Sequence, residues 1–171
     1  MDGYEQKYNL IDIQEKQLRF ERFDNEDAWQ LGCILANEAK RRGVSVAVDI
    51  VLNGYQVFRY GGQGTNNYNE IWLSRKIQSV NTMHVSTLKL YYMMRTGKED
   101  IYQGGNLDPA SYAAVGGGFP IYVNGTGCVG AVAVSGLTHH EDHDFAVDGL
   151  CKYLDRQVER VDECAFDPDQ P

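Results

Sequence analysis

Apolar residues in the first third of the chain recur first at helical and then at strand spacing. Residues 9–16 predict a short helix, and the alternation of apolar and polar residues over 17–23 predicts a strand. Asp24 is typical of a helix N-cap, and the apolar residues over 28–39 recur at helical spacing. Gly43 is placed to end this helix.

Two β-hairpins are predicted by Asn-Gly dipeptides that each divide a strand-like stretch. Asn53-Gly54 divides residues 44–60, and Asn124-Gly125 divides residues 119–134. Asn-Gly is the strongest short sequence signal for a tight hairpin turn. With 17–23, these runs predict five strands, and hairpins produce antiparallel sheet.

Helical patterns in the second half complete the predicted architecture. A long pattern begins at Glu70, and Ser86 or Thr87 is expected to break it into two helices. Thr138 and Glu141 have the spacing of a capping box that opens the last helix. The predicted fold class is therefore α+β, a five-stranded antiparallel sheet with helices packed on it.

Composition and charge exclude several classes of function but say little about the fold. The 171 residues fit a single domain, which we expect over 1–161, with an acidic tail over 162–171 that frays. A net charge of −8 argues against nucleic acid, and no apolar run is long enough to span a membrane. The four cysteines are widely spaced and the N-terminus lacks an apolar signal segment, so we expect free thiols and a cytoplasmic location.

Three histidines gather at the start of the last predicted helix. His143 is spaced to share a helical face with His139 or His140, as two metal ligands would. Glu141, Asp142 and His143 could also work as a general acid and base. The alternative for both is a solvated helix N-terminus with a capping box, and we expect no metal site.

The long predicted helix has a second side with its own character. Away from its apolar stripe lie Trp72, Arg75, Lys76, Ser79 and Met83. A solvated face is one interpretation. The other is an oligomer interface through Trp72 and Met83, because aromatic residues, Met and Arg are enriched at interfaces.

Asp49 stands in an otherwise apolar strand, where an unpaired carboxylate would be costly to bury. Arg75 or Lys76 is the expected partner, and Arg75 could bind the carboxylate at two points. The glycines at 116–118 precede a strand rather than a helix, unlike a phosphate loop. They predict a bend or the close approach of a ligand.

Together these residues predict a site for a small anionic ligand. Its expected members are Arg75, Lys76, Gly116, Gly117, Glu141, Asp142 and His143, with Asp49 as a structural partner. The simpler alternative is a salt bridge between Asp49 and Arg75, with His143 exposed to solvent.

Several segments, in this order, resemble the GlcG/HbpS superfamily, whose domain is often labelled haem-degrading. They are Asp24 to Ala39, Val46 to Ile50, Trp72 to Lys76, Leu107 to Pro109, Ala113-Ala114 with Gly116-Gly117, Phe119 to Ile121, Val134 to Leu137 and Glu141 to His143. The resemblance is to a branch of uncharacterised proteins. It implies a profilin-like fold with a five-stranded antiparallel sheet, homo-oligomers, and haem binding in some members.

Two valines occupy positions where the family usually has histidine. Val85 falls in the family's Gly-His-Ser-Ser motif, and Val115 falls in its Ala-Ala-His-Gly-Gly motif. Valine can neither ligate iron nor carry a proton. We therefore expect no cofactor, and haem enters only through the family resemblance.

These features predict a cytoplasmic homo-oligomeric binding protein that is not an enzyme and holds a small molecule or a partner protein. One alternative is a haem-binding or haem-degrading protein, or an enzyme that uses Glu141, Asp142 and His143. Another is a platform on which other proteins assemble.

Overall fold

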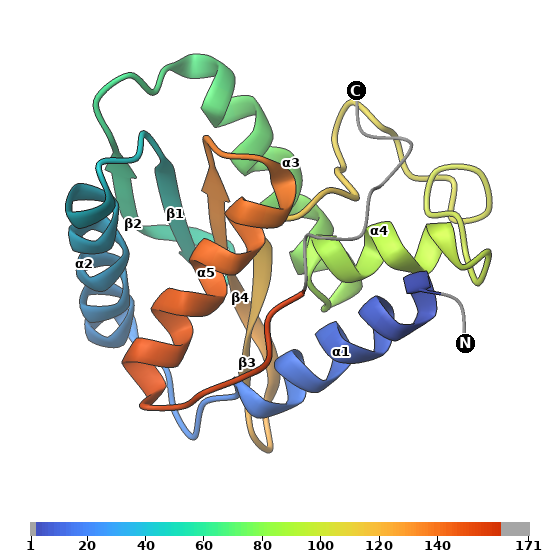
Figure 1. Cartoon of the computed structure of the whole chain (residues 1–171), viewed down its shortest axis with the longest axis horizontal. Helices are drawn as coiled ribbons and strands as arrows, with labels where there is room; N and C mark the ends of the chain where they lie inside the picture. Colours follow the sequence, from blue (N-terminus) through green and yellow to red (C-terminus); the bar gives the residue numbers. More distant parts are fainter. Residues whose placement is uncertain (1–2, 162–171) are drawn as a thin grey trace.

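The computed structural model describes residues 3–161, which form a four-stranded sheet with helices on both faces (Figure 1). In chain order the elements are α1 (Gly3–Gln17), α2 (Asn25–Arg42), β1 (Ala47–Leu52), β2 (Tyr55–Gly61), α3 (Asn67–Met83), α4 (Thr87–Arg95), β3 (Gly118–Val123), β4 (Gly127–Ser135) and α5 (His139–Leu154). The predicted α+β class is confirmed. The expected tail over 162–171 lies outside the described residues. Within 3–161, no helix is long and apolar enough to cross a membrane.

The strands lie in the order β2-β1-β4-β3, and each neighbouring pair is antiparallel. Both predicted hairpins are present, with Asn53-Gly54 joining β1 to β2 and Asn124-Gly125 lying between β3 and β4. A β-bulge between Ile50 and Val51 shifts the register of the first hairpin by one residue.

Two helices, α2 and α5, cover one face of the sheet, and α3 covers the other (Figure 1). Successive strand residues point to opposite faces. Val48 and Ile50 therefore join Leu35 in the main core under α2 and α5. On the other face Leu73 of α3 packs on Ala133, whose small side chain lets the helix lie close to the sheet.

Helix α1 packs against α4 at one end of the molecule, beside rather than on the sheet (Figure 1). Ile11 and Tyr92 belong to a small apolar cluster between them. Lys89 of α4 lies 2.6 Å from Asp12 and 3.0 Å from Glu15 of α1. Charged contacts therefore accompany the apolar ones. The helix predicted over 9–16 is present, but α1 begins well before it.

Helix ends follow the local signals closely. Asp24 caps α2 with a full capping box, and Gly43 ends it in the left-handed conformation with φ 67°. The predicted break of the long helix is confirmed: His84, with φ 58°, ends α3, and Ser86 caps α4. Thr138 caps α5 as predicted.

The strand predicted over 17–23 is wrong. This segment contributes one isolated bridge, Phe20 opposite Val123. Leu18 and Phe20 are both buried, so their alternation reflects two anchors of a link between helices rather than a strand. The described residues therefore form four strands, and the profilin-like arrangement stays a prediction.

Candidate functional site

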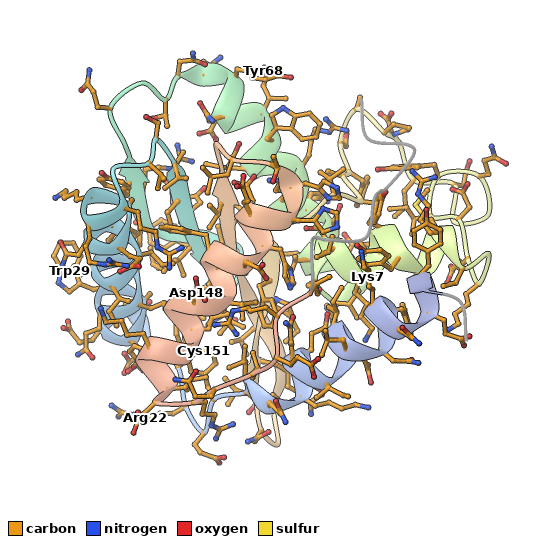
Figure 2. The ribbon with its side chains drawn as sticks, in the orientation of Figure 1. Lys7, Arg22, Trp29, Tyr68, Asp148 and Cys151 are labelled. Atoms are coloured by element: carbon orange, nitrogen blue, oxygen red, sulfur yellow. The ribbon has the colours of Figure 1, made fainter. Side chains whose placement is uncertain are left out.

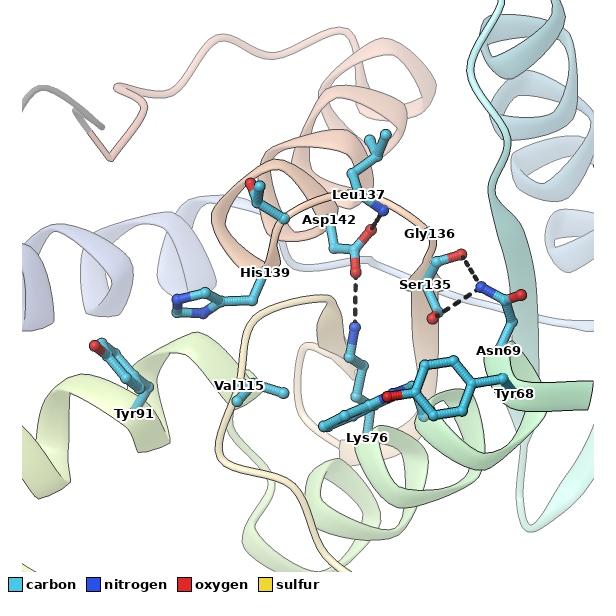
Figure 3. Close-up of a pocket in the computed structure, with 12 residues that line it drawn as sticks. Tyr68, Asn69, Lys76, Tyr91, Val115, Ser135, Gly136, Leu137, His139 and Asp142 are labelled. Carbon is cyan, nitrogen blue, oxygen red and sulfur yellow. Dashed lines mark hydrogen bonds and ion pairs between the residues drawn. The ribbon is translucent and has the colours of Figure 1, made fainter. Parts of the chain in front are cut away.

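A pocket of about 590 Å³ opens between α3, the end of β4 and the start of α5 (Figure 3). Its surface is mostly apolar, with a few polar groups. It is lined by Tyr68, Asn69, Trp72, Lys76, Tyr91, Val115, Ser135, Gly136, Leu137, Thr138, His139 and Asp142. A cavity of this size and lining is typical of a small-molecule site.

Lys76 and Asp142 form a buried ion pair at the base of this pocket (Figure 3). Lys76 Nζ donates to Asp142 Oδ2 at 2.9 Å and to the Val134 carbonyl at 2.8 Å. Asp142 Oδ1 accepts the Leu137 N–H at 3.0 Å. The two side chains are only 3% and 4% exposed. Their hydrogen bonds join α3, the end of β4 and the start of α5 at one buried polar contact.

Burial acts against the charge of both partners. It lowers the pKa of Lys76, and the attraction of the Asp142 carboxylate only partly opposes this shift. It also raises the pKa of Asp142, against the opposing effects of Lys76 and of the Leu137 and Gly136 N–H groups. The pair is therefore closer to its neutral form, amine and carboxylic acid, than a solvated pair would be.

Gly117 leaves room for the lysine. A Cβ at this position would lie 2.6 Å from Lys76 Nζ and 2.5 Å from the Val134 carbonyl oxygen. The residue also has φ 122°, a conformation that side chains rarely adopt. The glycine is thus required by both the backbone and the buried amine.

The neighbouring glycines contact this chain's own elements. Gly116 N–H donates to His139 Nδ1 at 3.2 Å, and Gly118 N–H donates to Thr87 Oγ1 at 2.9 Å. A Cβ at Gly116 would lie 2.1 Å from the His139 carbonyl oxygen. The glycine run predicted a bend or the close approach of a ligand, and at Gly116 the close neighbour is helix α5. The N–H groups of Gly116 and Gly118 donate to side chains of this chain and do not face an anion.

Aromatic side chains form the walls of the pocket. Trp72 meets Tyr68 edge to face, with ring centres 6.3 Å apart, and the Arg75 guanidinium lies 4.5 Å from the Trp72 ring centre. On the opposite wall Tyr91 meets His139 edge to face at 4.9 Å. Tyr68 projects outward from the start of α3 (Figure 2).

The predicted pairing of Asp49 with Arg75 or Lys76 is wrong. Arg59 Nη2 donates to Asp49 Oδ2 at 2.8 Å, and its Nε donates to Oδ1 at 3.1 Å. Gln56 Nε2 donates to Oδ1 at 2.7 Å. The β-bulge places Arg59 directly across the hairpin from Asp49, so the carboxylate is satisfied by residues outside the pocket lining.

The second side of α3 is not the solvated face that was one of its two predicted interpretations. Lys76 and Ser79 are buried rather than solvated. Arg75 donates to the Tyr112 carbonyl at 3.2 Å, outside the pocket lining. Met83 packs in an apolar cluster of the same chain, and its predicted interface role stays a prediction.

The start of α5 is more buried than its sequence indicates. His143 is fully buried with Nε2 2.9 Å from Gln14 Oε1, so an exposed His143 is wrong. His140 Nε2 lies 2.6 Å from the Tyr92 hydroxyl. Glu141 is exposed and completes the cap. Over residues 3–161, no three His, Cys, Asp or Glu side chains are grouped to hold a metal.

Part of the predicted ligand site does come together. Lys76 and Asp142 line the pocket, and Gly117 packs against their contact. Sequence reasoning missed the aromatic walls. A usable signal was present for one wall, because Tyr68 and Trp72 are four residues apart and share a helical face.

Comparison with known proteins places the chain in a family. A family model described as "Haem degrading protein HbpS-like" matches residues 23–151. A UPF0303 protein of Rhizobium rhizogenes is 40% identical over 161 residues, which cover 92% of this chain and 96% of that protein. UPF0303 protein SCO2848 of Streptomyces coelicolor is 38% identical over 144 residues, covering 84% and 91%.

Solved structures show the same fold. The crystal structure of the Ybr137w protein superposes with a TM-score of 0.78 at 26% identity and covers 86% of this chain and 87% of that one. The crystal structure of a PduOC:haem complex has a TM-score of 0.65 at 19% identity and covers 81% and 99%. The resemblance noted in the sequence is confirmed, and the chain belongs to the HbpS-like haem-degrading protein family.

Proposed function

We propose that this chain is a cytoplasmic, homo-oligomeric binding protein that holds a small, flat, mostly apolar ligand in the pocket beside Lys76 and Asp142. The observation that carries this proposal is an aromatic-walled cavity of about 590 Å³ over a buried polar pair. Apolar walls supply affinity, and a few fixed polar groups orient the ligand. The widely spaced free thiols Cys33, Cys128 and Cys151 fit a reducing compartment.

A neutral ligand fits this pocket better than the anion expected from the sequence. Lys76 Nζ already donates to Asp142 Oδ2 at 2.9 Å, and the pair has no net charge whichever partner holds the shared proton, so it offers an anion no net attraction. The Arg75 guanidinium instead lies over the Trp72 ring and donates to the Tyr112 carbonyl. The ligand therefore has an apolar ring system and an uncharged polar end.

Binding without turnover is the simpler interpretation of the polar groups. Of the three residues considered for acid–base chemistry, Asp142 lines the pocket, Glu141 caps α5 at the surface and His143 is buried against Gln14. They do not converge on one reacting centre. This separation supports a binding protein over an enzyme that uses all three.

Titration calorimetry with 2-naphthalenemethanol tests the proposal, because this probe combines a flat apolar ring with a neutral hydroxyl. Val115→Phe fills the pocket and is expected to abolish binding. Ser111→Phe is the matched control, since it adds the same ring at an exposed position outside the pocket lining. Equal binding by both variants and the unchanged protein would contradict the site.

Haem is a second candidate, favoured by the family and by the PduOC:haem structure. The pocket's donors do not fit histidine ligation of its iron. Val115 lines the pocket and occupies a position where the family usually has histidine. His139 Nδ1 accepts the Gly116 N–H at 3.2 Å, so the neutral ring carries its hydrogen on Nε2 and offers no free lone pair.

We therefore propose that haem is not the resident ligand and binds weakly. Haem titration followed through the Soret band is expected to show no sharp shift at a one-to-one ratio. A tight one-to-one complex that is lost in His139→Gln would show that the ring reorients to bind iron. Haem would then replace the neutral ligand as the leading candidate.

A further inference from the structure

The amine of Lys76 differs from a surface lysine in what surrounds it. Its side chain is 3% exposed, and the residue borders the aromatic-walled pocket. Nζ is held by two acceptors, the Val134 carbonyl and Asp142 Oδ2. Gly117 has no Cβ to crowd it. The amine therefore has a fixed position at the base of a mostly apolar cavity.

We propose that Lys76 captures a flat apolar aldehyde or ketone in this pocket as a reversible imine, with Asp142 as the proton donor and acceptor. The proposal rests on the binding function above and names the ligand's polar end as a carbonyl group. An imine needs an amine with a free electron pair and an acid in contact with it. Lys76 and Asp142 supply these two groups 2.9 Å apart.

The bonds balance within the pair and the ligand. Starting from amine and carboxylic acid, Nζ bonds to the carbonyl carbon while the carbonyl oxygen takes the Asp142 proton. The resulting carbinolamine loses its hydroxyl group as water, with a second proton that left Nζ and passed through Asp142. The products are a protonated imine, water and the Asp142 carboxylate, which lies beside the new cation. No oxidant or reductant is needed, and water reverses the reaction.

The second buried lysine shows why the site is specific. Lys89 is nearly buried, but it contacts two carboxylates, Asp12 at 2.6 Å and Glu15 at 3.0 Å. Burial acts to lower the pKa of Lys89, and these two acids outweigh it, so its pKa is raised. Lys89 also lies outside the pocket lining. It stays an ammonium ion, which cannot attack a carbonyl carbon.

The aromatic walls favour the same ligand class. Tyr68 and Tyr91 both line the cavity and lie on opposite sides of it (Figure 3), so a flat ring between them can contact aromatic side chains on both sides. Apolar walls also limit the water that would hydrolyse an imine. A ring-bearing carbonyl compound uses both the walls and the amine, whereas a small polar aldehyde would use the amine alone.

The test uses 2-naphthaldehyde with sodium cyanoborohydride, which reduces an imine to a stable amine, followed by peptide mass mapping of the full chain. We expect naphthylmethyl modification of Lys76 to exceed that of exposed Lys152 by about tenfold. Lys89 is expected to stay unmodified. Val115→Phe should protect Lys76, and Ser111→Phe should not. Lys76→Met removes the amine and should abolish modification at this position. The pair Val115→Phe and Ser111→Phe keeps the test decisive if Lys76→Met fails to fold.

Two results separate this inference from the binding function. If 2-naphthalenemethanol binds but Lys76 is modified no more than Lys152, the imine is wrong and the binding pocket stands. If neither naphthalene compound binds, both proposals fail. Modification of Lys76 that is equal in Val115→Phe and the unchanged protein would also overturn the inference, because the pocket would then have no part in it.

Discussion

Gln14 Oε1 lies 2.9 Å from His143 Nε2, and this contact determines which ring nitrogen carries the hydrogen. Gln14 Nε2 donates to the Glu159 carbonyl at 2.6 Å, so its amide oxygen is turned to accept from the histidine. His143 is thus a neutral ring with its hydrogen on Nε2. Among the described residues its Nδ1 has no hydrogen-bond partner. The contact joins α1 to α5 through a buried polar pair.

Acid should destabilise the protein through His143. Burial, reinforced by the nearby His140, Arg160 and His139, lowers the pKa of His143 from 6.5 to about 3. The unfolded chain therefore binds more protons between these values, so this stabilisation is complete above pH 6.5 and is lost as pH falls toward 3. The free energy of unfolding measured with urea is expected to be about 2 kcal/mol lower at about pH 5 than at about pH 7.5.

His143→Gln is the variant that isolates this effect, because an amide can still donate to Gln14 but does not titrate. It should be less stable than the unchanged protein near neutral pH and should lose most of the dependence on acid. Glu15, whose pKa burial raises against the attraction of Lys89, has the opposite sign and remains in both proteins. An unaltered pH dependence in His143→Gln would assign the effect to another group.

Arg59, rather than Arg75, should support the first hairpin. Arg59→Met leaves the buried Asp49 carboxylate with the Gln56 amide as its side-chain donor among the described residues, and we expect a loss of about 2–3 kcal/mol in the free energy of unfolding. Arg75→Met, which removes a contact to the Tyr112 carbonyl and to the Trp72 ring, should cost under about 1 kcal/mol. Urea unfolding of both variants decides the order, and a larger loss in Arg75→Met would contradict it.

Self-association should involve the exposed start of α3. Tyr68 and Ile71 are 65% and 50% exposed there, which is unusual for large apolar side chains on one helical turn. Light scattering is expected to give several times the 19.3 kDa chain mass. Ile71→Asp should lower that mass, while Ser74→Asp, an exposed change on the same helix, should lower it less. A monomer at micromolar concentration would remove the oligomer from the proposal.

Local signals in the sequence were sufficient for most of the fold. Asp24, Gly43 and Thr138 act within one helical turn, and an Asn-Gly turn acts between adjacent residues. Such signals do not depend on the rest of the chain. The failed strand over 17–23 has the same period as a strand, but its two buried side chains serve to anchor a link. Periodicity alone cannot separate these cases.

The site was harder to predict because its contacts depend on register and on distant segments. A regular hairpin closed by Asn53-Gly54 would place Asp49 opposite Phe58. The bulge after Ile50 adds one residue and brings Arg59 opposite Asp49 instead. No pattern of residues in the sequence predicts that bulge. Lys76 and Asp142 are 66 residues apart, and their contact exists because α3 and α5 meet at the end of β4.

Gly117→Ala should damage the pocket as well as the backbone. Its Cβ would lie 2.6 Å from Lys76 Nζ, so the lysine must leave Asp142 or the segment must move. We expect the free energy of unfolding to fall by about 3–5 kcal/mol, because of strain at φ 122° together with overpacking. We also expect weaker binding of 2-naphthalenemethanol.

Gly125→Ala is the matched control, because Gly125 also has positive φ, 77°, but nothing lies within 4 Å of its Cβ position. Backbone strain alone should lower its free energy of unfolding by about 1–2 kcal/mol, and it should still bind the probe. The difference between the two variants measures the close packing of Gly117 on the buried pair. If both lose the same stability and both bind the probe, Gly117 serves the turn alone and the amine has more room than its contacts indicate.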